Sequence, residues 1–548
     1  MNVVPEARRS STAAITPYQS TQPAGRDGFP QLLRSEWTKI RTVRAWVAAM
    51  IAAAVGVGLP IVALSATATD HNSIPNQPIG PGGLAVVDSF YTEHHPISAD
   101  GSITARVTSL TGRVIQFQGA SAPPGSSQPQ PWAKAGVIIK AGTRPGSPYA
   151  AIMITPDHGV RFQYDFTGDV AGLAGSVSAQ SPRWVRLTRS GDTITGYDSA
   201  DGAHWFTVGS VRLAGLPATA EAGIFVASPD DFISQQGYAS NDGVPYQTRA
   251  TAAFDHIALV GGTATAGWRA TQVGGPQGPA PAGPICGPGA GPHCGKTRAI
   301  GGQASGSAGS STRSVTLSGN GDIAPYVPIV DPIGVTYKGS VVGLIVVIAL
   351  AALFITSEYR RGLVRTTFIA SPRRGRVLVA KAIVIGAVTF VAGLIGAAIA
   401  FPIAEHKLVS GGWPTPIYPV RAITSGVGLQ IVIGTAALLA VAAVLTLAAG
   451  ALLRRSTGAI AAGVLALIFP LVLATVLPQG PAVWLLRLTP AAAFGVQQGN
   501  VHYTQVTHAC LPYNNCYPLA PWPGFAVLCA WALAALGLAI YVVRRRDA

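Results

Sequence analysis

The stretch Val427–Gly450 reads VGLQIVIGTAALLAVAAVLTLAAG and contains no Asp, Glu, Lys, Arg or His. A helix needs about 20 mostly apolar residues to cross roughly 30 Å of bilayer hydrocarbon. Only 11% of the 548 residues are charged and 49% are hydrophobic, whereas about a quarter of an average soluble protein is charged. The stretch therefore predicts a transmembrane helix.

Five further stretches share these properties, so the sequence predicts a membrane all-α bundle of six transmembrane helices. The other five are Ala45–Thr67, Ser340–Thr356, Ala382–Ala404, Thr457–Leu477 and Gly524–Val543. None of them contains Asp, Glu, Lys, Arg or His. Ion-coupled carriers usually keep such groups within the membrane, so their absence argues against a secondary transporter.

The basic residues predict which side of the membrane each loop occupies. If both termini are cytoplasmic, the cytoplasmic segments carry 19 of the 38 Lys and Arg residues against five acidic residues. The region between the first two spans, 68–338, holds 16 basic and 17 acidic residues. Because cytoplasmic loops are enriched in Lys and Arg, we expect a multi-pass plasma-membrane protein with a large extracytoplasmic domain. The net charge of +15 then requires no nucleic-acid partner.

The composition divides the chain into five predicted segments. Residues 1–30 are rich in Ser, Thr, Pro and Ala and predict a disordered cytoplasmic tail. An interfacial helix and the first span follow over 31–67, and the other five spans lie within 338–548. Residues 68–262 predict an inserted extracytoplasmic domain, and the Gly-, Pro- and Ser-rich segment 263–337 predicts a flexible linker.

The inserted domain has the short alternating segments of an all-β sandwich, separated by Gly, Pro, Asp and Asn. In one of these segments Phe162, Tyr164 and Phe166 are spaced to share one face. The predicted strands are Ser102–Val107, Ala135–Lys140, Tyr149–Ile154, Val160–Phe166, Arg183–Arg189, Thr193–Tyr197, Trp205–Val208, Gly223–Val226 and Thr251–Leu259.

Part of this domain resembles concanavalin-like jelly-roll modules, which carry the pattern W-R-L-x-R-x-G followed by S-x-D-G-x-x-W. The matching stretches are Arg183–Asp192 (RWVRLTRSGD), Tyr197–Ser199, Asp201-Gly202 and Trp205, with Trp132–Val137 and Ala253–Ile257 also similar. Such modules often bind glycans, sometimes with calcium.

The resemblance makes Trp132, Trp184 and Trp205 candidate glycan-binding residues. The alternative is that Trp184 and Trp205 are core residues and that Asp201-Gly202 is a hairpin turn. Glycoside hydrolysis requires two placed carboxylates, and no such pair stands out. We therefore predict no catalytic residues and no metal site.

Four cysteines lie on the predicted extracytoplasmic side in two close pairs, Cys286 with Cys294 and Cys510 with Cys516. Two local disulfides are expected in that oxidising environment, and free thiols are the alternative. Cys529 lies within the last predicted span and is expected to be a packing residue.

One stretch, Ala290–Thr297 (AGPHCGKT), nearly matches a phosphate-binding loop but has Ala in place of its first Gly. A functional loop joins a buried strand to a helix. This one lies in the Pro- and Gly-rich linker instead, so we expect the chain to bind no nucleotide or other cofactor.

The predicted cytoplasmic segments resemble permease subunits of actinobacterial type-2 ABC exporters, over roughly 30–67 and 338–548. The matching stretches are Leu33–Arg44 (LRSEWTKIRTVR), Thr356–Thr367 (TSEYRRGLVRTT), Ser371–Arg376 (SPRRGR) and Trp484–Ala491 (WLLRLTPA). The large inserted domain departs from that family. The resemblance implies a separate ATPase subunit that carries ATP and Mg²⁺, and a second permease subunit, either a second copy or a related chain.

Leu33, Trp37 and Ile40 are spaced to form one apolar stripe of a helix, which suits an interfacial helix on membrane lipid. In the resembled family the loop corresponding to Glu358–Lys381 docks on the ATPase, whereas the alternative is a basic anchor alone. We expect Glu358 to pair with a basic partner or to cap the basic run. The candidate coupling residues are Glu358, Tyr359, Arg360, Arg361, Arg365, Arg373 and Arg374.

The sequence thus favours the permease subunit of an ATP-driven exporter. The alternative is a membrane-anchored extracytoplasmic glycan-binding receptor or envelope sensor without transport. An enzyme is the weakest hypothesis. Co-purification with an ATPase would separate the first two.

The charge distribution makes the topology testable by cysteine labelling. An impermeant thiol reagent applied to intact cells should label Ser240→Cys but not Arg365→Cys, because we expect residue 240 to be outside and residue 365 to be cytoplasmic. Labelling of residue 365 alone would reverse the predicted orientation.

Overall fold

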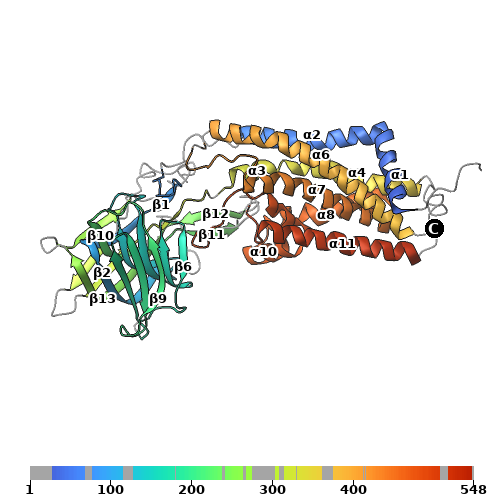
Figure 1. Ribbon diagram of the computed structural model, residues 1–548. Helices are drawn as coiled ribbons and strands as arrows, with labels where there is room; N and C mark the ends of the chain where they lie inside the picture. Colours follow the sequence, from blue (N-terminus) through green and yellow to red (C-terminus); the bar gives the residue numbers. More distant parts are fainter. Residues whose placement is uncertain are drawn as a thin grey trace, which may run out of the picture.

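The computed structural model consists of a β domain at one end and a bundle of long helices at the other (Figure 1). Helix α1 and the C-terminal end of α11 lie at the end of the bundle far from the β domain. The structure describes residues 28–67, 77–114, 128–178, 180–236, 241–262, 267–274, 303–307, 314–328, 330–360, 374–411, 413, 415–506 and 516–545.

Within the described ranges, six stretches of helix are long and apolar enough to cross a membrane, as predicted, and they contain all six predicted ranges almost completely. The helices are α1 (Phe29–Thr42), α2 (Arg44–Thr67), α3 (Pro332–Tyr337), α4 (Ser340–Arg360), α6 (Arg374–Ser410), α7 (Gly426–Leu453), α8 (Ser456–Leu467), α9 (Phe469–Ala474), α10 (Gln479–Leu488), η1 (Pro490–Gln497) and α11 (Pro521–Arg545). The second candidate span combines α3 with α4, and the fifth combines α8 with α9.

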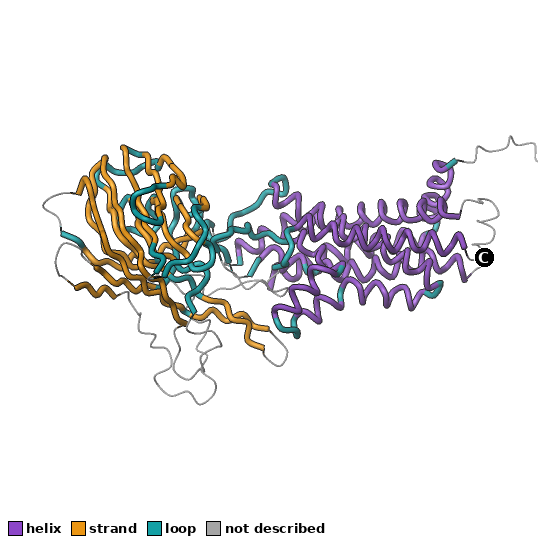
Figure 2. Tube along the Cα trace, turned by 90° about the horizontal axis from the view of Figure 1, so that it is seen from below, coloured by secondary structure: helices purple, strands orange, loops and turns teal. Residues whose placement is uncertain are grey.

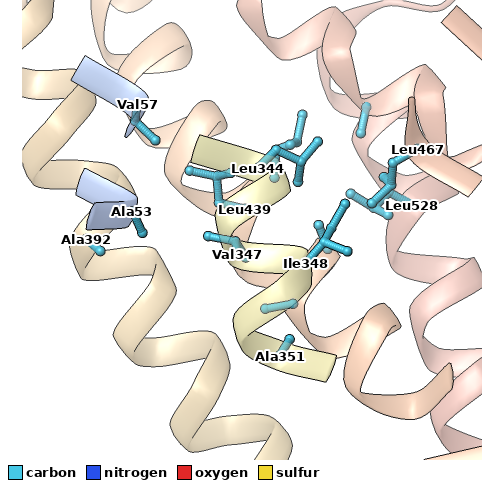
Figure 3. Close-up of a cluster of buried hydrophobic side chains, with 14 of the residues drawn as sticks. Ala53, Val57, Leu344, Val347, Ile348, Ala351, Ala392, Leu439, Leu467 and Leu528 are labelled. Atoms are coloured by element: carbon cyan, nitrogen blue, oxygen red, sulfur yellow. The ribbon is translucent and has the colours of Figure 1, made fainter. Parts of the chain in front are cut away.

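Most of the bundle shares one large apolar core (Figure 3), beside a smaller cluster formed by α9, α10 and η1. Val57 of α2, Leu344 of α4, Leu439 of α7 and Leu528 of α11 are all fully buried in the large core. Small residues let the helices approach closely. A Cβ atom on Gly343 of α4 would lie only 2.9 Å from the backbone nitrogen of Val57, so this crossing requires glycine.

The segment after the fifth candidate span was expected to be an outer loop, but it contains two further elements. α10 runs back from α9, and η1 is a 3₁₀ segment in which every residue is buried. η1 packs against α7 and α11. Its PAAAFGVQ sequence is too short and too rich in small residues to read as a span, which is why the sequence did not reveal it.

Strand β2 (Phe90–Val114) organises the β domain, because two groups of strands share it. On one side, β14 and then β13 follow β2 along its length. On the other side, the first half of β2 pairs with β10 and the second half pairs with β7. The β10-β3-β4-β5-β6 group then folds over the β7-β8-β9 group and encloses a buried apolar core. Figure 2 shows these strands gathered at one end of the molecule, apart from the long helices.

The domain is thus an antiparallel β sandwich, and all nine predicted strands are present. The observed strands besides β2 are β1 (Val86–Asp88), β3 (Lys134–Lys140), β4 (Tyr149–Thr155), β5 (Gly159–Tyr164), β6 (Gly168–Ala171), β7 (Arg183–Ser190), β8 (Thr193–Ser199), β9 (Phe206–Arg212), β10 (Ala220–Ala227), β11 (Asp231–Gln236), β12 (Asn241–Tyr246), β13 (Thr248–Gly262), β14 (Arg269–Val273), β15 (Gln303–Ser307), β16 (Ser314–Gly319) and β17 (Ile323–Pro325).

The grouping of Phe166 with Phe162 and Tyr164 is wrong. Phe162 belongs to the core between the sheets and Tyr164 packs against it, but β5 ends at Tyr164. Asp165 and Phe166 then take positive φ angles of 44° and 66°. This turn places Phe166 in a separate apolar cluster on the opposite face of the β10-β3-β4 sheet.

The expected flexible linker 263–337 is also corrected, because it contains β14, β16, β17 and α3 among its described residues. Val315 and Leu317 of β16 are buried in the sandwich core. The Ser-Val-Thr-Leu-Ser-Gly run of β16 alternates as a strand should, but the surrounding Gly, Ser and Pro residues obscured that signal.

The first and last strands of the β domain pair with each other, and both are linked to β3 by ion pairs. β1 pairs with β17, with Val86 opposite Pro325. Lys140 of β3 donates to Asp88 of β1 at 2.7 Å, and Lys134 is ion-paired with Asp322 beside β17. Burial raises the pKa of Asp88 and lowers that of Lys140, while each partner's charge opposes the shift. The buried ion pairs therefore depend on both ends of the inserted domain.

This arrangement predicts that the fragment 78–326 folds alone and is more stable than the fragment 80–265. The shorter fragment lacks β14, β16 and β17 and leaves Lys134 without Asp322. Breaking a buried ion pair costs about 3–5 kcal/mol, so its thermal midpoint should be clearly lower. Far-UV circular dichroism during heating would measure both midpoints, and equal midpoints would contradict the assignment of these strands to the domain.

Candidate functional site

Four charged side chains from three helices meet at the end of the bundle far from the β domain. Glu36 and Lys39 come from α1, Glu358 from the last turn of α4, and Lys381 from the second turn of α6. Both Glu36 and Lys381 are only 2% exposed. We call this group the charge cluster.

Lys381 lies between the two carboxylates. Its Nζ is 2.7 Å from Glu36 Oε2 and 2.6 Å from Glu358 Oε1. Lys39 completes the cluster, with its Nζ 2.8 Å from Glu36 Oε1 and 3.1 Å from Glu358 Oε1. Two positive and two negative charges therefore balance, and charge-assisted hydrogen bonds offset the cost of removing them from water.

The carboxylates of the cluster favour the charged form of Lys39. Burial alone would lower the pKa of Lys39, but its hydrogen bonds and charge attraction to Glu36 and Glu358 raise the pKa above the ordinary lysine value. The ammonium of Lys381 also lies 4.9 Å from the centre of the Phe354 ring. A cation over an aromatic face is stabilised by the ring.

The turn between α7 and α8 adjoins the cluster through Arg454. This residue ends α7 with a positive φ of 56°. Its guanidinium lies 5.5 Å from the centre of the Tyr359 ring. Since Tyr359 follows Glu358 directly, α1, α4, α6 and the α7–α8 turn all meet around this one point.

Of the candidate coupling residues, the structure places Glu358 and Tyr359 at this point and describes only some of the others. Glu358 and Tyr359 lie in α4, and the half-buried Arg374 begins α6. Arg360 ends α4, and its side chain is not described. Arg361, Arg365 and Arg373 lie outside the described residues. Of the two roles expected for Glu358, pairing with a base occurs within this chain, with Lys39 and Lys381.

The expectation that the helices of the bundle carry no ionisable side chain requires correction. α6 extends past both ends of the predicted range Ala382–Ala404 and so includes Lys381 and Glu405. Glu405 is 4% exposed and accepts a hydrogen bond from the Tyr418 hydroxyl at 2.7 Å. The predicted range stopped at Lys381 and Glu405 because each is ionisable. The sequence does not show which residues contact these two side chains in the fold. The argument against an ion-coupled carrier is correspondingly weaker.

The predicted apolar stripe of α1 is only partly buried. Ile40 is buried in the bundle core and Leu33 packs against that core. Trp37 is 49% exposed and lies at the edge of that face, on the side of the exposed Arg34 and Arg41. The face toward the bundle is therefore formed by Leu33, Glu36 and Ile40.

The three candidate glycan-binding tryptophans do not form one surface. Trp132 is 5% exposed and stacks on His158, with 3.9 Å between ring centres. It lies near Arg161, on the face of β5 turned away from the sandwich core. Trp184 and Trp205 instead lie at the other sheet.

Trp184 and Trp205 are half-buried, and both contact other groups of the domain. Gly202, in the turn between β8 and β9, packs so closely on Trp184 that a Cβ would lie 2.7 Å from its ring. The Arg186 guanidinium covers Trp205 at 3.8 Å. Asp201 accepts hydrogen bonds from the backbone of Ala203 and His204, as the hairpin-turn interpretation requires.

Among the cysteines, Cys516 is disulfide-bonded and Cys529 is a free thiol. Cys286, Cys294 and Cys510 lie outside the described residues, so the two pairings stay predictions. Among the described residues, no group of three or more His, Cys, Asp or Glu side chains could hold a metal ion.

Comparison with known proteins gives no family. No protein-family model and no curated protein matches the chain. Among solved structures, scytalido-glutamic peptidase bound to a transition-state analogue is similar at 10% identity, with a TM-score of 0.23, over 42% of this chain and 98% of the peptidase. The GH43 protein BlXynB from Bacillus licheniformis is similar at 14% identity, with a TM-score of 0.17, over 30% of this chain and 28% of that protein.

The charge cluster predicts that removing Lys381 is far more harmful than removing another lysine of the same helix. Lys381→Met leaves two buried carboxylates with one lysine, which should cost about 3–5 kcal/mol. Lys407→Met is the control, because Lys407 lies in α6 and is only half-buried. Unfolding of the purified chain in detergent would measure both effects.

The triple variant Glu36→Gln/Glu358→Gln/Lys381→Met should recover much of the lost stability, because it leaves no unpaired carboxylate and its one remaining charge, on Lys39, has a side chain that is 42% exposed. Equal midpoints for Lys381→Met and Lys407→Met would contradict the role of the cluster.

Proposed function

We propose that this chain is the permease subunit of an ATP-driven ABC exporter, inserted in the plasma membrane and coupled to a separate ATPase. The observation that supports this proposal is the charge cluster. It joins α1 to α4 and α6 at one end of a bundle whose helices have the length and composition of membrane spans.

The charge cluster lies where a force from the proposed ATPase can be transmitted to the helices. The basic segment 361–373, which lies outside the described residues, connects α4 to α6 in the sequence. A force on that segment moves the ends of both helices, and the cluster carries the movement to α1 because Glu358 and Lys381 both contact α1 side chains. ATP and Mg²⁺ would be held by the partner ATPase. A second permease subunit, either another copy or a related chain, would complete the translocation path.

The alternative is a membrane-anchored receptor or envelope sensor that binds glycans through the β domain without transport. One observation favours it. Arg186 lies on the outward face of β7 beside Trp205, and its Nε donates a hydrogen bond to a neutral hydroxyl, Thr104 Oγ1, at 2.8 Å. A receptor needs no ATPase, so the same experiment separates the two proposals.

Two sets of substitutions should separate docking of the ATPase from transmission of its force. Arg360→Ala/Arg361→Ala/Arg365→Ala should abolish pull-down of the ATPase, because it removes the charges that can bind carboxylates bidentately. Glu358→Gln should keep the pull-down but reduce substrate-stimulated ATP hydrolysis by about tenfold or more, equivalent to roughly 1.4 kcal/mol.

Arg212→Ala is the matched control, because Arg212 is a highly exposed arginine of the β domain. It should change neither measurement. Normal pull-down and normal hydrolysis in all the loop and cluster variants, or failure of any ATPase to co-purify with the wild-type chain, would favour the receptor.

A further inference from the structure

The chain between η1 and Val506 contacts both halves of the molecule within nine residues. Gln497, the last residue of η1, is fully buried in the bundle. Gln505 is 2% exposed and contacts the β domain. We call residues 497–505 the strap.

The first part of the strap is bonded to three elements of the bundle. Gln497 Nε2 donates to Ser340 Oγ of α4 at 2.8 Å and to Thr435 Oγ1 of α7 at 3.3 Å. The backbone N–H of Gly499 donates to Asp331 Oδ2 at 2.6 Å. Asp331 also caps the N-terminus of α3. The strap therefore begins at the meeting point of η1, α3, α4 and α7.

The last part of the strap is bonded to the turn between β5 and β6. Gln505 Nε2 donates to the carbonyl oxygen of Phe166 at 3.1 Å, and Thr504 Oγ1 donates to Asp169 Oδ2 at 3.2 Å. Phe166 is the residue with positive φ that enters the apolar cluster behind β3 and β4. The contact is thus made beside a buried side chain, Phe166, although Asp165 is half-buried and Thr167 is exposed.

The strap supplies a second attachment at a different place from the covalent one. The chain enters and leaves the β domain at neighbouring points, because β1 pairs with β17. An attachment at one place leaves rotation about that place unrestrained, and a second attachment at Phe166 and Asp169 restrains it.

We infer that the strap couples the β domain to η1, so that loosening either one loosens the other. Coupling of this kind is reciprocal by thermodynamic necessity. The inference does not rest on transport, because it concerns this chain without any partner.

Hydrogen exchange of the full-length chain in detergent tests the inference. Thr504→Ala/Gln505→Ala should raise exchange about fivefold both in the β5–β6 turn, 165–170, and in η1, 490–497, which is roughly the lower limit expected for two lost hydrogen bonds. Gln497→Ala, made at the opposite end of the strap, should raise exchange in the β5–β6 turn.

Val501→Ala is the control, because Val501 lies within the strap and is 49% exposed. It should leave both regions unchanged. Peptides from β3 and β4 should exchange as in the wild type in every variant, which shows that the domain stays folded. If the double variant does not fold, Gln505→Glu replaces it, since a carboxylate cannot donate to the Phe166 carbonyl.

An increase confined to the mutated end, or no increase at either end, would overturn the inference. Increases at both ends in the two strap variants, with none in Val501→Ala, would support it.

Discussion

A buried lysine in an apolar bundle has to be neutralised, and the arrangement of three helices follows from how this chain does so. Lys381 contacts carboxylates from α1 and from α4. A lone ammonium at such a site would be strongly destabilising. α1 therefore cannot leave the bundle without breaking the buried ion pair between Glu36 and Lys381, and the ends of α4 and α6 cannot separate without breaking the pair between Glu358 and Lys381.

The β domain follows an analogous rule. Lys134 and Lys140 lie at the two ends of one strand, and each is neutralised by a carboxylate next to a strand through which the chain enters or leaves the domain. In both the helix bundle and the β domain, buried ion pairs thus connect segments that are far apart in the sequence. Such pairs add little net stability compared with apolar packing, but they specify which pieces meet.

Local patterns in the sequence were sufficient to predict the helices and strands but not the ion pairs that connect distant segments. The six helices and nine strands could be predicted because uninterrupted apolar runs and alternating residues are properties of neighbouring residues. Glu36 and Lys381 are 345 positions apart, and the sequence alone does not show that they meet. The ends of α6 were misplaced for the same reason, since a charge that ends an apolar run becomes acceptable only when its partner is known. β16 and η1 were missed because Gly, Ser, Pro and Ala conceal their regular structure.

The pairing of β1 with β17 has a consequence for how such a molecule could arise. Strands paired in this way lie about 5 Å apart, so the chain re-enters the bundle close to where it left. A short reverse turn could connect these two points as well as the whole β domain does. The connection from α2 to α3 therefore sets no limit on the size of what is inserted between them, and a whole module could be gained or lost there in a single genetic event without altering the helices on either side.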